Sequence, residues 1–108
     1  MSDGTGLPDS EQRRADFVAQ TAQIAFSDLQ RYFAAGRLVW VKDALDLIEV
    51  AVQLAEDNAA QFERWLAAGE IDAVSDAQAA LWLSQERLLW AVVADPWVLV
   101  QERIHSSL

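Results

Sequence analysis

A chain of 108 residues, 53% of them hydrophobic, is long enough for one folded domain with a single core. The sequence has no cysteine, which excludes disulfides, thiol catalysis and cysteine-ligated metal centres, and which is typical of a cytoplasmic protein. Seventeen acidic and eight basic residues give a formal charge of −9, which disfavours binding to the phosphate backbone of nucleic acids.

The beginning of the chain, residues 1–8, is small, polar and glycine-containing, and predicts a mobile tail. It has neither the basic segment nor the apolar segment of a signal peptide. No apolar run reaches the roughly 18 residues of a membrane-spanning helix, so no membrane association is expected. The remaining residues, 9–105, are predicted to form a single globular domain.

The first helix is predicted to begin at Asp9 or Ser10, both good N-cap residues, and to end at Gly36. Apolar residues recur between these limits at steps of three and four, the spacing of one helix face. Glycine suits a helix end because it adopts positive φ without a steric penalty. The apolar residues 37–41 that follow form a short connector, which an extended conformation would suit.

A second helix is predicted from an N-cap at Asp43 to Gly69, because apolar residues again alternate at steps of three and four. A break near Asp57 remains an alternative, since Asn58 with Gln61 three residues later is a suitable start for another helix.

The junction at Gly36 recurs at Gly69, where a helix, a glycine and an aliphatic residue two positions later follow one another in the same order. Two copies are too few for a solenoid, so we interpret them as a repeated helix–helix corner. Ser75 with Gln78 predicts a capping box at the start of the next helix.

The most apolar stretch, residues 88–100, is interrupted only by Asp95 and Pro96. Its valines suit two buried strands. The other interpretation is a helix to about Ala94 and then a last helix, with Asp95 as its N-cap and Pro96 at its first position. A tight hairpin turn would favour Gly or Asn, so the helical interpretation is preferred. The predicted fold is therefore mainly α, a compact bundle of four to six helices around this segment. The alternative is an α+β fold with a small β-hairpin at 88–103.

Several motifs of the chain, above all Trp90-Ala-Val-Val-Ala-Asp-Pro-Trp-Val-Leu-Val-Gln101, resemble a family of small uncharacterised bacterial proteins that is classed only as a domain of unknown function. The resemblance covers about residues 15–103, and its most specific element is Pro96-Trp-Val-Leu-Val-Gln101. Ala94 departs from the family motif, which has a third aliphatic residue there. The resemblance implies a bacterial cytoplasmic protein of about this size, and it implies no activity, cofactor or catalytic residue.

Carboxylates are the plentiful chemical groups of the sequence. They form an acidic stripe on the second predicted helix, made of Asp46, Glu49, Glu56 and Asp57. Oxygen ligands of this kind suit Mg²⁺ or Ca²⁺, or a general acid–base pair. The spacing matches no EF-hand loop, however, and the Glu-x-x-His pairs of di-metal bundles are missing, so a solvated face or a surface that attracts a basic partner is the simpler interpretation. The single histidine, His105, is interpreted as solvated.

Five tryptophans raise the question of an interface, because Trp is common both in cores and at binding hot spots. Trp40 lies in a connector and Trp97 follows a proline, so these two, together with Trp90, are the candidates for an interface or pocket. We therefore expect a non-catalytic interaction protein, which either self-associates or binds a protein partner, with no cofactor or resident metal. The alternative is a protein that binds a small molecule or a divalent metal, with enzyme activity based on carboxylates as an option.

Overall fold

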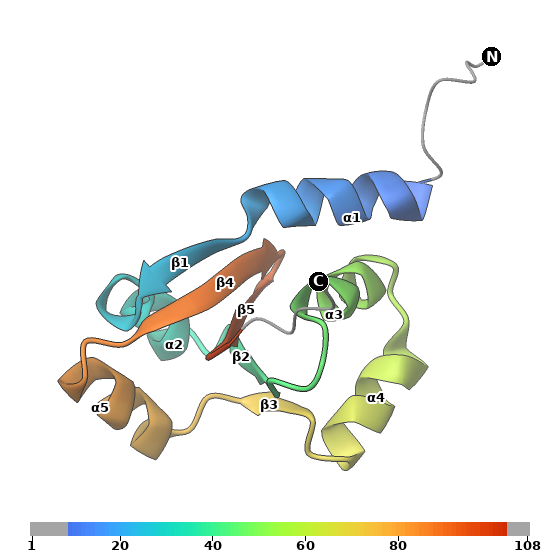
Figure 1. Ribbon diagram of the computed structural model, residues 1–108. Helices are drawn as coiled ribbons and strands as arrows, with labels where there is room; N and C mark the ends of the chain where they lie inside the picture. The colour runs from blue at the N-terminus through green and yellow to red at the C-terminus, as the bar shows by residue number, and fades with distance from the viewer. Residues whose placement is uncertain (1–8, 104–108) are drawn as a thin grey trace.

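The computed structural model describes residues 9–103; the expected tail over residues 1–8 and His105 lie outside the described residues. The described chain has an α+β architecture, with helices and strands interleaved along the sequence (Figure 1). The elements are α1 (Asp9–Gln20), β1 (Ala22–Ala25), the 3-10 helix η1 (Phe26–Asp28), α2 (Gln30–Ala34), β2 (Leu38–Val41), α3 (Leu47–Ala55), α4 (Ala59–Ala67), β3 (Ile71–Ala73), α5 (Asp76–Ser84), β4 (Leu88–Ala94) and β5 (Trp97–Gln101).

The strands form one five-stranded sheet in the order β1-β4-β5-β2-β3. β5 lies in the middle, where it pairs antiparallel with β4 and parallel with β2. The other two pairs, β1 with β4 and β2 with β3, are antiparallel and place β1 and β3 at the edges. The sheet is therefore mixed, and the parallel pair joins two antiparallel halves.

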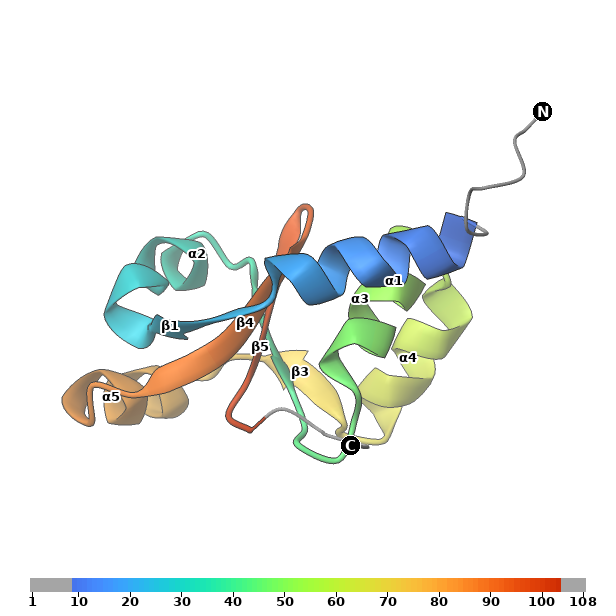
Figure 2. The same cartoon turned by 45° about the horizontal axis from the view of Figure 1, so that its top comes forward.

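Helices cover both faces of the sheet, with α1, α3 and α4 on one side and α2 and α5 on the other (Figure 2). Alternate residues of each strand point to opposite faces, so Val39 and Leu99 pack against α3, whereas Leu38 and Val98 pack against η1, α2 and α5. The central strands are consequently buried on both faces, as the full burial of Leu99 and Val100 shows.

The prediction of a mainly α bundle is wrong, because the segment at its centre is a β-hairpin. β4 and β5 pair from Trp90 with Gln101 to Ala94 with Trp97, and the chain reverses at Asp95 and Pro96, which are joined by a cis peptide bond. A strand buried on both faces is a continuous apolar run, and its periodicity cannot be distinguished from that of a buried helix. The hairpin alternative describes this segment, within a larger sheet than expected.

The predicted first helix is likewise broken, since α1 ends at Gln20 and the chain then forms β1, η1 and α2 before Gly36. At the end of α1 the hydroxyl of Thr21 donates a hydrogen bond to the carbonyl of Phe17 at 2.7 Å. Ile24 then packs in the cluster around α2 and α5, opposite Leu89 of β4. This pairing across the sheet overrides the local helical spacing.

Other helix boundaries follow the predicted capping chemistry. The predicted helix break near Asp57 is confirmed, and the Asn58 side chain accepts a hydrogen bond from the backbone N–H of Gln61. Ser75 and Gln78 form the predicted capping box of α5. The predicted cap at Asp43 is wrong, because Asp46 caps α3.

A buried glutamine fixes the central strand to the loop before α3. Gln101 is fully buried, and its Nε2 donates to the carbonyls of Lys42 and Leu45 at 2.8 and 2.7 Å. The last residue of the Pro96–Gln101 motif therefore has a structural role in the middle of the sheet. Within residues 9–103, none of the helices has the length and apolar character needed to cross a bilayer.

Candidate functional site: a recess at the hairpin tip

A recess of about 350 Å³ lies between the tip of the β4–β5 hairpin and the corner that joins α3 to α4. We call it the hairpin recess. Two aromatic residues and three carboxylates line it, and Lys, Arg and His are absent from the lining. The residues that line it are Leu54, Asp57, Asn58, Ala59, Phe62, Glu63, Ala94, Asp95, Pro96 and Trp97.

The α3–α4 corner is built by backbone hydrogen bonds at the end of α3. Asp57 adopts the left-handed conformation with φ 57°, so its N–H donates to Leu54 and that of Asn58 to Gln53. The same pair of bonds ends α2, α4 and α5, where the left-handed residues are Gly36, Gly69 and Glu86. Asp57 therefore occupies a position for which glycine is the usual residue.

A chain of side-chain hydrogen bonds connects this corner to α1. Arg14 donates to Glu49, Glu49 accepts from Gln53 at 2.7 Å, and Gln53 accepts from Asn58 at 2.6 Å. Asn58 also caps α4 through Gln61, so both ends of its amide are used. The chain of hydrogen bonds thus ends at Asn58, which lines the hairpin recess.

The three carboxylates of the hairpin recess, unlike the other three of the acidic stripe (Asp46, Glu49 and Glu56), have no side-chain partner among the described residues. Within residues 9–103, no side-chain hydrogen bond or ion pair engages Asp57, Glu63 or Asp95. All three residues are exposed, and they come from the end of α3, from α4 and from the hairpin tip. Their negative charge is therefore not neutralised within the described part of the chain.

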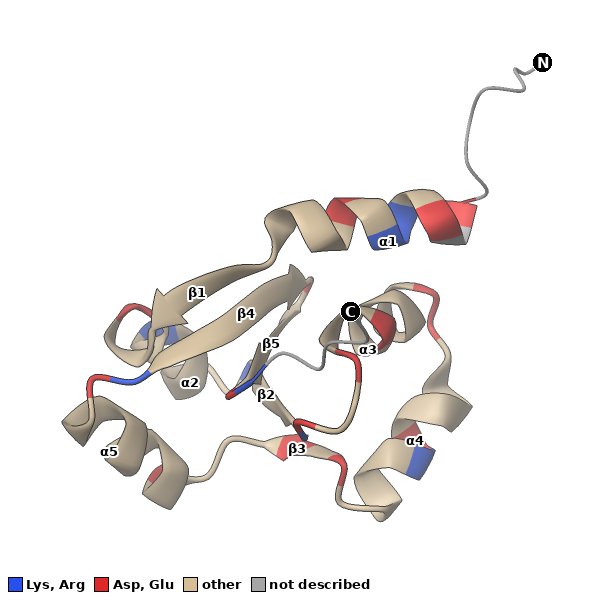
Figure 3. Cartoon of the chain, in the orientation of Figure 1, with Lys and Arg blue, Asp and Glu red and all other residues tan. Residues whose placement is uncertain are grey.

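Three of the four acidic stripe residues serve the packing of α1 on α3. Asp46 caps α3 and lies 3.9 Å from Arg14, whereas Glu56 lies 3.9 Å from Arg13. Figure 3 shows the basic segment of α1 close to α3, where Glu49 lies. Of the predicted stripe, Asp57 alone lines the hairpin recess.

These contacts shift the ionisation of Glu49 and Arg14. Hydrogen bonds from Gln53 and then from Arg14 lower the pKa of Glu49 below its ordinary value, and together they outweigh the effect of partial burial. The hydrogen bond to Glu49 raises the pKa of Arg14. Both shifts favour the charged pair at neutral pH.

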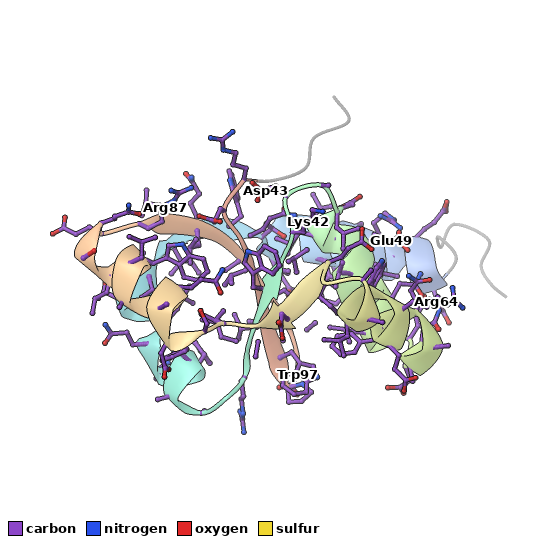
Figure 4. All side chains as sticks on the ribbon, turned by 90° about the horizontal axis from the view of Figure 1, so that it is seen from below. Lys42, Asp43, Glu49, Arg64, Arg87 and Trp97 are labelled. Atoms are coloured by element: carbon purple, nitrogen blue, oxygen red, sulfur yellow. The ribbon has the colours of Figure 1, made fainter. Side chains whose placement is uncertain are left out.

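The structure separates the three tryptophan candidates. Trp97 lines the hairpin recess and projects at the hairpin tip, across the molecule from Lys42 in Figure 4. Trp90 and Trp97 both pack, partly buried, against the cluster around α3, and Trp40 packs against the cluster on the opposite face. The Nε1 of Trp40 is buried and lacks a hydrogen-bond partner among the described residues.

Sequence reasoning did not select Phe62, Glu63 or Asp95, the other aromatic and acidic residues of the hairpin recess. Phe62 is half-buried, packs against the core cluster around α3 and also lines the recess. Asp95 was interpreted as a helix cap, because the hairpin had been read as two helices. The α3–α4 corner places Phe62 and Glu63 near Asp57, whereas the turn at Asp95–Pro96 brings Asp95 to the same recess, an approach that no local spacing encodes.

Chemically, the hairpin recess offers aromatic surface and uncompensated negative charge. In the described part of the chain, no group of three or more His, Asp or Glu side chains is placed to hold a metal ion. A second recess of about 410 Å³ lies between α2 and α5 and is lined mostly by apolar residues, among them Phe33, Ala79 and Leu83. The recess at the hairpin tip is thus the place where predicted aromatic and acidic candidates meet.

Comparison with known proteins agrees with the resemblance seen in the sequence. The chain is similar over its whole length to a solved structure, the NMR solution structure of PA1075 from Pseudomonas aeruginosa, with 35% sequence identity, a TM-score of 0.74 and 98% of that chain covered. The search of curated proteins gave no match. Residues 12–102 match the family described as "Protein of unknown function (DUF2288)", and the chain belongs to this family.

Proposed function

We propose that this protein is a non-catalytic interaction protein that binds a positively charged segment of a protein partner at the hairpin recess. The proposal rests on one observation, namely that Trp97 and Phe62 lie in the same recess as Asp57, Glu63 and Asp95, whose carboxylates are unpaired among the described residues. Aromatic anchors beside unpaired charge are features of interfaces that bind a partner of opposite charge.

The charge of the whole chain favours a partner other than a second copy. At a net charge of −9, two copies repel one another, whereas a basic segment is attracted from a distance. The acidic residues are widely spread over helices and loops, whereas β1 and β4 carry no charge (Figure 3). The field of the protein therefore guides a basic segment, and the hairpin recess supplies the contact.

A small organic cation is the second candidate ligand, because a volume of about 350 Å³ is within the range of small-molecule sites. Such a ligand would use the same carboxylates and rings. The two candidates differ in what surrounds the site, since a protein partner also covers the exposed residues around the recess and a small molecule does not.

Site-specific photo-crosslinking in cells tests the proposal. A photoreactive amino acid at Ala59, an exposed residue of the recess lining, is expected to crosslink a distinct protein. The same amino acid at Ala44, which is exposed in the loop before α3 and outside the recess lining, is the matched control and is expected to give no such product.

The charge dependence of the crosslink is the decisive comparison. The Ala59 product is expected to disappear when Asp57→Asn and Asp95→Asn are combined, because these changes remove charge and preserve side-chain shape. Equal crosslinking at Ala44, or a product that is insensitive to both substitutions, would contradict the proposal. A crosslinked homodimer would show instead that the partner is a second copy.

A further inference from the structure

We propose that the group received by the hairpin recess is the guanidinium of an arginine side chain, an inference that depends on the proposed function and specifies its partner. The juxtaposition that carries it is a pair of aromatic walls, Trp97 and Phe62, with three carboxylates from different segments of the chain around them. An arginine side chain combines a long apolar stem with a flat, permanently charged end.

The negative charge of the three carboxylates favours a cationic ligand, and their origin in different segments favours a cation with several N–H donors. Asp57 lies at the end of α3, Glu63 within α4, and Asp95 at the hairpin tip. A guanidinium has five N–H donors arranged in one plane, so it can donate to a carboxylate while its other donors remain available to a second one. Asn58 does not compete for them, because its amide is engaged by Gln53 and Gln61.

The apolar part of the lining selects a flat, weakly hydrated cation. Leu54, Ala59, Ala94 and Pro96 accompany the two rings, so the part of a bound group that lies against them is shielded from water. A guanidinium is less strongly hydrated than the ammonium of lysine and stacks on aromatic faces. Arginine is therefore expected to bind more tightly than lysine, although both carry one positive charge.

The protein supplies a matched control for the role of the charge at Asp57. Glu86 has the same left-handed backbone, φ 51° compared with 57°, at the end of α5, and it is not part of the recess lining. Asp57→Asn removes a recess carboxylate while keeping a side chain that tolerates positive φ. Glu86→Gln removes one charge at the corresponding position elsewhere, so it reports any general effect of net charge.

The test is an NMR titration of the whole protein with three probes, the N-acetyl methylamides of arginine, lysine and citrulline. Citrulline has the shape of arginine without its charge. Arginine is expected to shift the indole N–H of Trp97 and the backbone amides of 57–63 and 94–97. Its apparent Kd is expected to be at least about threefold lower than that of lysine, and citrulline is expected not to saturate.

In the variants, Asp57→Asn is expected to weaken arginine binding about threefold or more, and Glu86→Gln to leave it unchanged at constant ionic strength. Asp95→Asn, at an exposed turn, is expected to weaken arginine binding as well, and this effect does not depend on the backbone of the α3–α4 corner. Equal affinity for lysine and arginine, shifts centred elsewhere, or no saturable shift would each overturn the inference.

The photo-crosslinking experiment distinguishes failure of the arginine assignment from failure of the proposed interaction function. A charge-dependent Ala59 crosslink without arginine binding would leave the interaction function standing and overturn the arginine assignment. Loss of both signals would overturn both.

Discussion

Arg14 of α1 donates a hydrogen bond to Glu49 of α3, and this contact joins the first helix to the rest of the molecule. Among the described side chains of α1, Phe17 is the buried one, so α1 has a small apolar anchor. The chain of hydrogen bonds continues through Gln53 to Asn58 at the hairpin recess. The polar contacts of α1 consequently matter more for its position than they would for a well-buried helix.

Separate and combined replacement of Arg14 by Ala and Glu49 by Gln should reveal this coupling. Each single change is expected to lower the free energy of unfolding by about 0.5–1 kcal/mol, since the side chains are 42% and 36% exposed and water screens the pair. The double variant should cost less than the sum, as urea denaturation can measure. Arg13→Ala is the control. Arg13 lies 3.9 Å from Glu56, so its replacement should lower the free energy of unfolding by less than that of Arg14. Strict additivity would show that the pair contributes nothing.

Glu49 should also make stability depend on pH. Its pKa is lowered in the folded protein, first by Gln53 and then by Arg14, so its contribution is present above the ordinary value of 4.5 and is lost as pH falls through the lower folded value. Urea denaturation between pH 7 and pH 3 should therefore show a steeper decline in wild type than in Glu49→Gln. Parallel curves for the two proteins would rule this contribution out.

The two acidic residues at left-handed helix ends should respond differently to replacement by glycine. Glu86→Gly is expected to raise the free energy of unfolding by about 0.5–1 kcal/mol, because glycine adopts positive φ without the penalty that other L-residues incur. Asp57→Gly should raise the free energy of unfolding by less, since aspartate tolerates the left-handed region better than glutamate.

The two glycine variants also separate stability from binding. Asp57→Gly should bind the arginine probe more weakly although it is at least as stable as wild type, because it has lost a recess carboxylate. Thermal denaturation together with the NMR titration checks both effects. A destabilised Glu86→Gly would show that its side chain contributes more than its backbone conformation costs.

The buried amide of Gln101 is expected to be important for folding stability. Gln101→Leu keeps a similar volume but leaves the carbonyls of Lys42 and Leu45 without this donor, at a cost of about 2–4 kcal/mol. Gln23→Leu, an exposed position of β1 in the same sheet, is the control and should change stability by less than about 0.5 kcal/mol. Similar effects at the two positions in urea denaturation would argue against the structural role of Gln101.

Local chemistry was readable from the sequence where one or two neighbouring residues determine the conformation. Asn58 and Ser75 start helices, and Gly36 and Gly69 end them with φ of 72°. At Glu86 the same left-handed end is formed by a residue that gives no such signal. Capping was therefore predictable, except at Glu86, where an atypical residue takes the position of glycine, and at α3, where Asp46 is the cap in place of Asp43.

Sheet formation was not readable in the same way, because it depends on partners that are distant in the sequence. Ile24 pairs with Leu89, and Leu38 with Val98, across many intervening residues. β5, which is buried on both faces, and β4, where Leu88 and Val93 are exposed, both show continuous apolar sequence in place of alternation. The consequent error in 88–100 changed the predicted fold class from α+β to mainly α.

The candidate site was predictable only in its ingredients. Asp57 and Trp97 were selected separately, one as part of an acidic stripe and the other as an exposed tryptophan. The hairpin turn brings them to one recess and adds Asp95, whereas Asp46, Glu49 and Glu56 turn toward α1. Which carboxylates are neutralised by arginine follows from helix packing, and helix packing is a property of the fold.

The central position of β5 has a consequence for how the chain folds during synthesis. β5 follows all other strands in sequence, yet it supplies the hydrogen-bonded edges that join the β1–β4 pair to the β2–β3 pair. A nascent chain that ends before residue 97 therefore has two separate strand pairs with no shared edge. The ribosome must release the last strand before the sheet can close, and until then apolar strand edges are open to other chains.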